Sequence, residues 1–134
     1  MTGTVLMFVN GQAMSGGVLS DALASARFVG PARTAAAYRF FCYADTFPGL
    51  LPVGEGGWPV PGEVYEISYS QLRTALLPRE PAELELSVIE LEDGRGVLSM
   101  VCRDDPAGAD GVREITEAGG WRAHLAARSQ ASAR

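Results

Sequence analysis

The chain has 134 residues, a formal net charge of −5 at pH 7, 47% hydrophobic residues and 20% charged residues. This length and composition are those of one folded domain with an apolar core, and they exclude a mainly disordered chain. The sequence contains no lysine, one histidine (His124) and one asparagine (Asn10). A Schiff-base lysine, a P-loop lysine and a multi-histidine metal site are therefore excluded.

All basic side chains are arginines, and lysine, asparagine and isoleucine are absent or rare. This bias indicates a GC-rich, bacterial coding genome, so the arginines are not a signal for nucleic acid. The acidic balance agrees, because a phosphate-binding face needs a local excess of cations. We expect no nucleic-acid partner.

The two cysteines, Cys42 and Cys102, each lie in an apolar run. We expect reduced, buried thiols that pack as small hydrophobic groups, and their spacing matches no zinc motif. Neither a metal nor a cofactor is expected. The first nine residues do not form a signal peptide, and no apolar run reaches 18 residues, so we expect a cytoplasmic protein without a membrane partner.

The first part of the chain predicts strands and one short helix. Residues 4–9 are a continuous apolar run, typical of a buried strand, and a glycine-rich turn follows. An apolar stripe at helical spacing predicts a helix over residues 18–26. Strands are predicted within residues 27–34 and over 38–43, where aromatic residues favour extended structure.

The middle of the chain contains many helix and strand breakers. Four prolines and several glycines predict a long loop over residues 45–61. Residues 63–67 return to a strand. Ser68 and Gln71 have the spacing of a capping box, which predicts a helix over residues 69–77 that ends at the following prolines.

The last part predicts a hairpin and a final helix. Residues 84–91 and 96–103 flank an Asp-Gly turn, and a short strand is expected over residues 112–115. Thr116 is the predicted cap of a helix that carries Trp121 and His124. We expect one domain over residues 1–128 and a disordered tail over residues 129–134.

These elements amount to six or seven short strands and two or three helices in irregular order. Such an order favours an α+β domain with a curved, barrel-like sheet over a doubly wound parallel sheet.

Three places could carry chemistry. The turn after the first strand offers backbone amides that could hold a carboxylate or phosphate oxygen, although the sequence alone favours a plain strand-to-helix connection as the reason for its glycines. Glu80 and Glu83 follow the predicted central helix, where a partly desolvated carboxylate could move protons, but charges at strand ends are usually solvated. His124 beside Trp121 is better explained by packing, or by a cation at a helix terminus, than by catalysis.

Several segments resemble the gamma-glutamylcyclotransferase-like superfamily, and in particular the carboxy-terminal domain of allophanate hydrolase. The matching segments are residues 9–16 (VNGQAMSG), 27–38, 47–50 (FPGL), 61–67 (PGEVYEI), 90–94 (ELEDG) and 115–125 (ITEAGGWRAHL). The closing ITxxGGWR is the most specific of them.

The resemblance implies a small mixed β-barrel with flanking helices and a cavity at one mouth. In cyclotransferases the turn binds the substrate through its backbone, which points here to Asn10, Gly11, Gln12, Ala13 and Met14. A glutamate after the central helix moves the proton, and it corresponds to Glu83 or Glu80, with Glu83 preferred.

The chain departs from both family patterns in this turn. Asn10 stands where cyclotransferases have a tyrosine, and Ala13 stands where allophanate hydrolase domains usually have a histidine. Three interpretations remain open. The protein is an enzyme acting on a small carboxylated urea-pathway or γ-glutamyl-like substrate, a domain that only binds such a molecule, or an assembly domain that forms a homodimer or pairs with a separate amidase.

Overall fold

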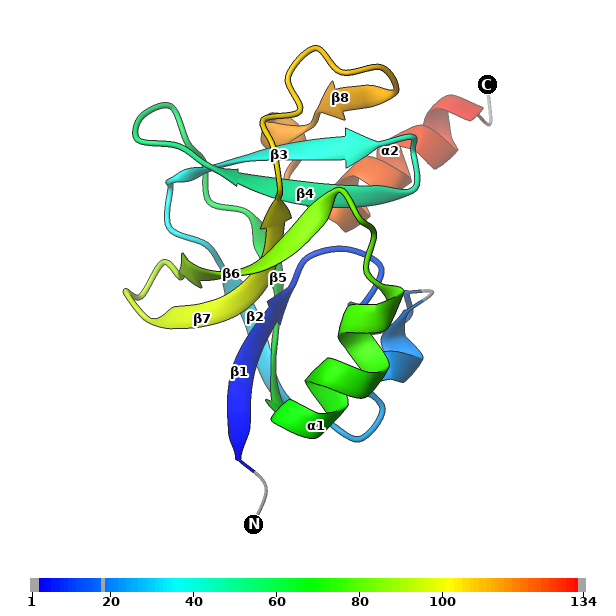
Figure 1. Ribbon diagram of the computed structural model, residues 1–134. Coiled ribbons are helices and arrows are strands. Elements are labelled where there is room, and N and C mark those ends of the chain that lie inside the picture. Colours follow the sequence, from blue (N-terminus) through cyan, green and yellow to red (C-terminus); the bar gives the residue numbers. More distant parts are fainter. Residues whose placement is uncertain (1–2, 18, 133–134) are drawn as a thin grey trace.

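The computed structural model describes residues 3–17 and 19–132, and these form one curled, mixed β-sheet flanked by helices (Figure 1). The strands are hydrogen-bonded in the order β2-β5-β1-β7-β4-β3-β8, and β6 pairs with β7. The strands are β1 (Thr4–Val9), β2 (Arg27–Arg33), β3 (Tyr38–Tyr43), β4 (Phe47–Pro52), β5 (Pro61–Ser68), β6 (Leu84–Glu90), β7 (Gly96–Cys102) and β8 (Val112–Glu114). The predicted α+β class and barrel-like curvature are confirmed.

Two helical regions lie beside the sheet. In Figure 1 the segment that begins with α1 lies next to β1, and α2 lies next to β3 and β4. The helices and helical turns are η1 (Ser20–Leu23), α1 (Tyr69–Gln71), η2 (Leu72–Leu76), η3 (Leu77–Arg79), η4 (Thr116–Ala118) and α2 (Trp121–Ser132).

The sheet divides at β7. One edge of β7 pairs along its whole length with β6 in the predicted hairpin. The other edge pairs in parallel with β1 at Leu98 and, further along, with β4 at Val101. Between Leu98 and Val101 the neighbour of β7 on this edge changes from β1 to β4, so β1 and β4 separate there. Both strands remain joined to the sheet through β7.

The predicted loop over residues 45–61 is wrong in its first part, because β4 lies within it. β4 pairs antiparallel with β3 from Tyr43 opposite Phe47 to Tyr38 opposite Pro52. Prolines 48 and 52 suggested a loop because they cannot donate a backbone hydrogen bond. The strand forms nevertheless, since Leu50 is fully buried in the core and the long pairing with β3 supplies the other hydrogen bonds.

Three helix predictions also need correction. Only η1 forms within residues 19–26, where successive i to i+3 hydrogen bonds lead directly into β2; residue 18 lies outside the described residues. Thr116 does not cap α2, because its hydroxyl accepts from the backbone N–H of Phe40 at 2.9 Å and η4 begins there instead. α2 extends to Ser132, into the stretch predicted as a tail, and residues 133–134 lie outside the described residues.

The central helical segment agrees with its predicted start. The hydroxyl of Ser68 accepts a hydrogen bond from the backbone N–H of Gln71 at 3.0 Å, as a capping residue should. The segment continues through η2 and η3 to Arg79, two residues beyond the predicted end. Glu80 is then extended (φ −79°, ψ 145°), the conformation that a following proline favours.

Gly62 allows β5 to cross close to β1. A Cβ atom at this position would lie 2.4 Å from the carbonyl oxygen of Val9 and 2.5 Å from Cζ of Phe8. We therefore expect Gly62→Ala to lower the free energy of unfolding by about 1–3 kcal/mol, because the backbone oxygen cannot move aside without breaking strand pairing. Urea denaturation measures this loss.

Gly96 supplies the matched control for this substitution. It also lies in a strand, but an added Cβ would meet nothing closer than 3.6 Å. Gly96→Ala should change the unfolding free energy by less than about 0.5 kcal/mol. Equal effects at the two glycines would show that the close approach of β1 and β5 does not govern stability.

Candidate active site

A cavity of about 40 Å³ lies where β1 and β4 diverge from β7. Its walls come from the ends of these strands, from the turn after β1 and from the segment after η3. The lining residues are Met7, Phe8, Val9, Asn10, Gly11, Gln12, Ala13, Leu19, Phe47, Pro48, Glu80, Pro81, Leu84, Ser99 and Met100. The division of the sheet therefore creates the cavity, and most of its wall is apolar.

The structure brings four of the five predicted turn residues to this cavity: Asn10, Gly11, Gln12 and Ala13. Met14 does not line it, since its side chain is buried in the core on the other side of the turn. Gly11 is needed for close packing, because an added Cβ would lie 2.6 Å from Cδ of Pro48.

Hydrogen-bond donors at the turn remain available. The amide nitrogen Nδ2 of Asn10 is buried and has no hydrogen-bond partner among the described residues. The backbone N–H groups of Gln12 and Ala13 likewise have no acceptor within residues 3–17 and 19–132, whereas the N–H of Met14 donates to the carbonyl of Gly11. A buried donor without a partner, such as Nδ2 of Asn10, is rare in folded proteins and suggests a ligand or water molecule.

The buried carboxylate of Glu63 holds the turn after β1 in place. Glu63 of β5 is 6% exposed and accepts hydrogen bonds from the backbone N–H and the hydroxyl of Ser15, both at 2.8 Å. The Tyr65 hydroxyl donates to it at 3.2 Å, and Arg122 lies at 3.4 Å. Arg122 also donates to the carbonyl of Ser15 at 2.6 Å, so α2, β5 and the turn are tied together.

This network keeps Glu63 ionised. Burial alone would raise its pKa, but the two hydrogen bonds from Ser15 and the positive charge of Arg122 outweigh it and hold the pKa below its ordinary value. Glu63 is thus a structural anion that positions the turn.

Glu80 has the opposite environment. Its carboxyl group lines the apolar cavity and is half-buried, and desolvation raises its pKa to about 7. A carboxyl group with such a pKa is populated in both protonation states at neutral pH, as general acid-base catalysis requires.

Glu83, the preferred glutamate of the sequence analysis, lies elsewhere. Its side chain is exposed and faces a separate surface hollow with Tyr43 and Arg103. The extended backbone at Glu80 and Pro81 carries the chain away from the cavity before Glu83 is reached. Of the two candidates, the structure therefore brings only Glu80 to the predicted turn.

Sequence reasoning missed the residues that support the turn: Ser15, Glu63 and Arg122. A signal for Glu63 was present, because an acidic residue inside a largely buried strand requires a partner. Arg122 belongs to the specific ITxxGGWR segment, where Gly119 and Gly120 have φ of 87° and 107° and turn the chain into α2. His124 is buried 5.5 Å from the Trp121 ring, so packing beside this aromatic residue is confirmed.

Comparison with known proteins places the chain in a family. The family model of the allophanate hydrolase C-terminal domain matches residues 5–126. Urea amidolyase of Saccharomyces cerevisiae is 29% identical over 106 residues, which are 75% of this chain but 6% of that protein. The chain thus spans a small part of the length of this relative.

Solved structures show the same fold. The uropathogenic E. coli-specific protein c4763 is 37% identical with a TM-score of 0.84, over 92% of this chain and 97% of that chain. Kluyveromyces lactis allophanate hydrolase is 25% identical with a TM-score of 0.86, over 94% of this chain and 22% of that chain. An aig2-like protein of Mus musculus, 20% identical with a TM-score of 0.61 over 81% and 82% of the chains, shares the fold.

Within the described residues, no helix has the length and apolar character needed to cross a membrane.

Proposed function

The chain belongs to the allophanate hydrolase C-terminal domain family, and we propose that it is an enzyme acting on a small carboxylated molecule. The substrate is a carboxylated intermediate of urea or allophanate breakdown, or a γ-glutamyl-like compound. Glu80 is its general acid and base.

One observation carries this proposal. A half-buried carboxyl group with a pKa of about 7 shares a small cavity with the unpartnered Nδ2 donor of Asn10. Donors for a negatively charged ligand and a group that exchanges protons at neutral pH are thus next to each other. Such a combination is typical of active sites, where pKa values are tuned by burial.

The residues can divide the work as follows. The free N–H groups of Gln12 and Ala13 and the amide of Asn10 hold the carboxylate of the substrate. Glu80, when ionised, takes a proton from the attacking group, and the resulting carboxylic acid returns it to the leaving group. Glu63 and Arg122 keep the turn in the conformation that presents the donors.

The cavity also limits the size of the substrate. A volume of about 40 Å³ holds a few water molecules and not a peptide or a nucleotide. A small carboxylate fits this limit, with the mouth of the cavity available for the remainder of a longer γ-glutamyl-like compound.

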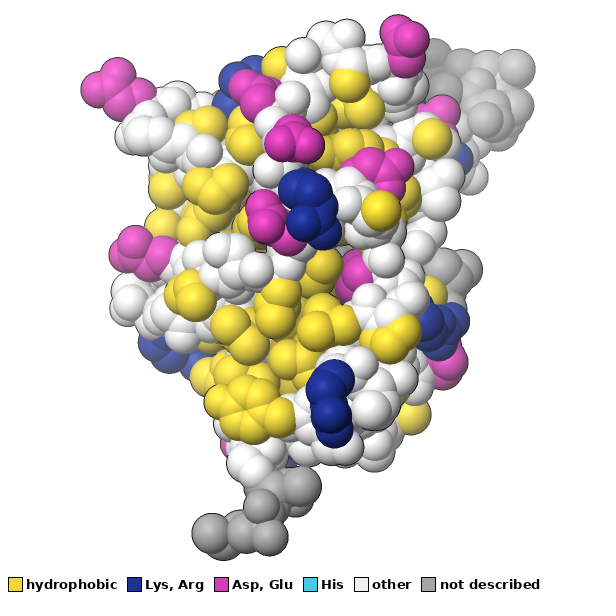
Figure 2. All heavy atoms as spheres, in the orientation of Figure 1, with side chains coloured by type: hydrophobic (Ala, Val, Ile, Leu, Met, Phe, Trp, Pro, Cys, Tyr) yellow, Lys and Arg dark blue, Asp and Glu magenta, His cyan; other side chains and the backbone are white. Residues whose placement is uncertain are grey.

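A role in assembly is a second candidate, favoured by exposed apolar side chains. Leu86 and Val88 are 37% and 67% exposed on β6, an edge strand of the sheet. Figure 2 shows further apolar side chains gathered over β1 and α1. Exposed apolar edge strands are common association surfaces, and the family is also found within larger proteins that the chain matches over a small part of their length.

The test of the enzymatic proposal is turnover of a panel of small carboxylates, including allophanate-like and γ-glutamyl compounds, followed by NMR. We expect conversion of at least one member by the purified protein. Binding without conversion would support a binding domain. Neither binding nor conversion, together with co-elution of a separate amidase on size-exclusion chromatography, would support assembly instead.

A further inference from the structure

Three potential metal ligands from two distant segments of the chain meet between β3 and α2. They are the thiol of Cys42 in β3, the carboxylate of Asp45 in the β3–β4 turn and the imidazole of His124 in α2. One ligand atom of each lies within 4.8 Å of the others. This cluster lies apart from the cavity that holds Glu80, because none of its members lines that cavity.

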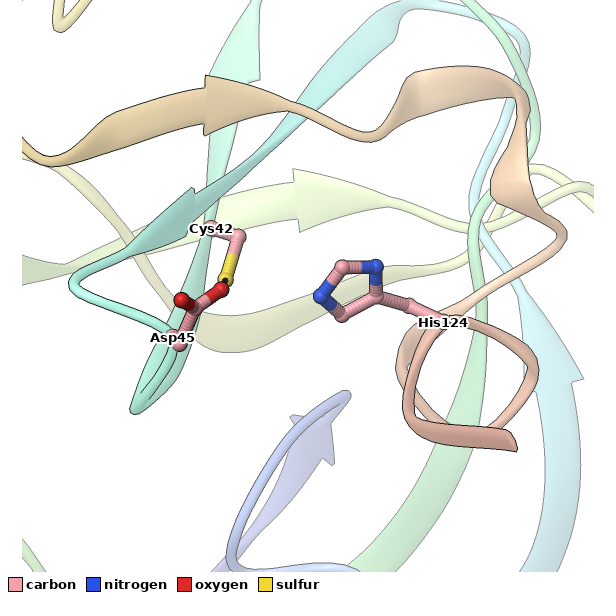
Figure 3. Close-up of side chains that lie close together, drawn as sticks. All are labelled: Cys42, Asp45 and His124. Atoms are coloured by element: carbon pink, nitrogen blue, oxygen red, sulfur yellow. Dashed lines mark hydrogen bonds between the residues drawn. The ribbon is translucent and has the colours of Figure 1, made fainter. Parts of the chain in front are cut away.

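The imidazole of His124 is the most informative member. The residue is 7% exposed, and its Nε2 atom is buried without a hydrogen-bond partner among the described residues. Figure 3 shows a ring nitrogen of His124 directed toward Cys42 and Asp45, so the unpartnered side chain points into the cluster. A buried imidazole nitrogen without a partner is costly unless a ligand satisfies it.

Cys42 and Asp45 complete the donor set. Cys42 is 1% exposed, and its thiol lies 3.9 Å from Oδ1 of Asp45. Asp45 is exposed and borders the surface hollow beside α2, so it is the member of the cluster that faces solvent. Ala44 and Asp45 both have positive φ (52° and 55°), a conformation that aspartate tolerates and that is unusual for alanine.

Two arginines face the same carboxylate. Arg113 donates to Oδ1 of Asp45 at 2.7 Å, and Arg128 lies 4.0 Å from that oxygen and donates to the Asp45 carbonyl at 2.9 Å. These cations repel a metal ion, and Arg113 occupies Oδ1, the same oxygen that lies 3.9 Å from the Cys42 thiol, so a metal must displace this hydrogen bond. A metal at this position must therefore gain most of its affinity from the sulfur and nitrogen donors.

We propose that Cys42, Asp45 and His124 bind one Zn²⁺ ion. Zn²⁺ is bound by thiolate, imidazole and carboxylate ligands, whereas magnesium and calcium prefer oxygen ligands alone. In a tetrahedral zinc site, neighbouring ligand atoms lie roughly 3.5 Å apart. Since Sγ of Cys42 and Oδ1 of Asp45 are already 3.9 Å apart, the remaining closure of about 1 Å must come mainly from His124 in α2. A water molecule fills the fourth position.

Binding changes the bonding as follows. Zn²⁺ forms a bond to the sulfur of Cys42, and the thiol proton is released to solvent. The ion then joins α2 to the β3–β4 turn. Because Gln12 donates a hydrogen bond to the carbonyl of Thr46, this turn is also tied to the substrate-binding turn.

The experiment is a titration of the reduced, full-length protein with Co²⁺ and then Zn²⁺. We expect a near-ultraviolet charge-transfer band from a thiolate bound to Co²⁺, its loss on addition of one equivalent of Zn²⁺, and a higher melting temperature with Zn²⁺. Cys42→Ser should weaken Zn²⁺ binding at least about 100-fold, and Asp45→Asn, which removes the weaker ligand, about 10-fold. Cys102→Ser is the matched control and should leave binding unchanged, because Cys102 is a buried cysteine outside the cluster.

An opposite change gives a second readout. Arg113→Gln removes a cation next to Asp45 and should tighten Zn²⁺ binding about twofold to fivefold. Asp45 and Arg113 are both exposed, so these variants should fold. The absence of saturable one-to-one binding would overturn the proposal, as would binding that Cys42→Ser and Asp45→Asn leave intact.

Discussion

Glu80→Gln is expected to reduce turnover of the small carboxylated substrate by about 10²–10⁴-fold while the protein remains folded. Glutamine has nearly the shape of glutamate, so the cavity keeps its lining and the substrate still binds. It cannot accept and return a proton, and proton transfer is the role that we propose for this residue. Initial rates measured by NMR or a coupled assay, with KM and kcat separated, test the prediction.

Glu83→Gln provides the control three residues further along. Glu83 is exposed and faces a different hollow, so this substitution should leave kcat and KM nearly unchanged. The reverse pattern, in which Glu83→Gln is inactive and Glu80→Gln is active, would show that the general acid and base is Glu83, which lies outside the cavity. Full activity of both variants would exclude a catalytic role for this segment.

Glu63→Gln should lower the free energy of unfolding by about 1–3 kcal/mol and weaken binding of the carboxylated ligand. The Ser15 N–H and hydroxyl donate to different oxygens of Glu63, and a glutamine replaces one of these acceptors with an NH2 donor; the neutral amide also loses the attraction of Arg122. The loosened turn then presents its donors less well. Chemical denaturation and ligand titration measure the two effects.

The stability effect of Glu63→Gln should depend on pH. The folded protein holds the pKa of Glu63 below its ordinary value of 4.5, so its ionised form stabilises the fold. This stabilisation is fully present above the ordinary value and is lost as the pH falls through the lowered pKa. The difference between wild type and variant should therefore be largest at neutral pH and shrink in acid.

Glu66→Gln is the matched control on the same strand. Glu66 forms an exposed ion pair with Arg27 at 3.1 Å, and such pairs contribute little. We expect a change below about 0.5 kcal/mol and unaltered ligand binding. A loss at Glu66 as large as that at Glu63 would show that the buried network around Ser15 does not hold the turn.

Much of the fold was predictable because local patterns agree with the tertiary structure. The apolar run of β1, the Asp-Gly hairpin and the Ser68 cap each form as expected. β4 was not predictable from its own residues. Its prolines resemble a loop, and only the long-range pairing with β3 makes the segment extended.

The candidate site was predictable in its parts and not in its arrangement. The sequence indicated the turn and two glutamates. Which of Glu80 and Glu83 reaches the cavity depends on the direction that the extended chain takes after η3. Glu63 and Arg122, which form an ion pair, are 59 positions apart in the sequence. Cys42 and His124, which meet in the proposed zinc site, are 82 positions apart. No local pattern encodes such contacts, since the closure of the sheet brings them together.

The most direct test of the proposed active site is an NMR titration of the Glu80 side-chain carboxyl, without and with a small carboxylate from the panel. We predict a pKa of about 7 in the free protein. A bound carboxylate in the same cavity should raise this pKa further, because a second negative charge disfavours ionisation. An ordinary glutamate pKa, or a value that a bound carboxylate does not alter, would contradict the assignment of Glu80 and the turn to one active site.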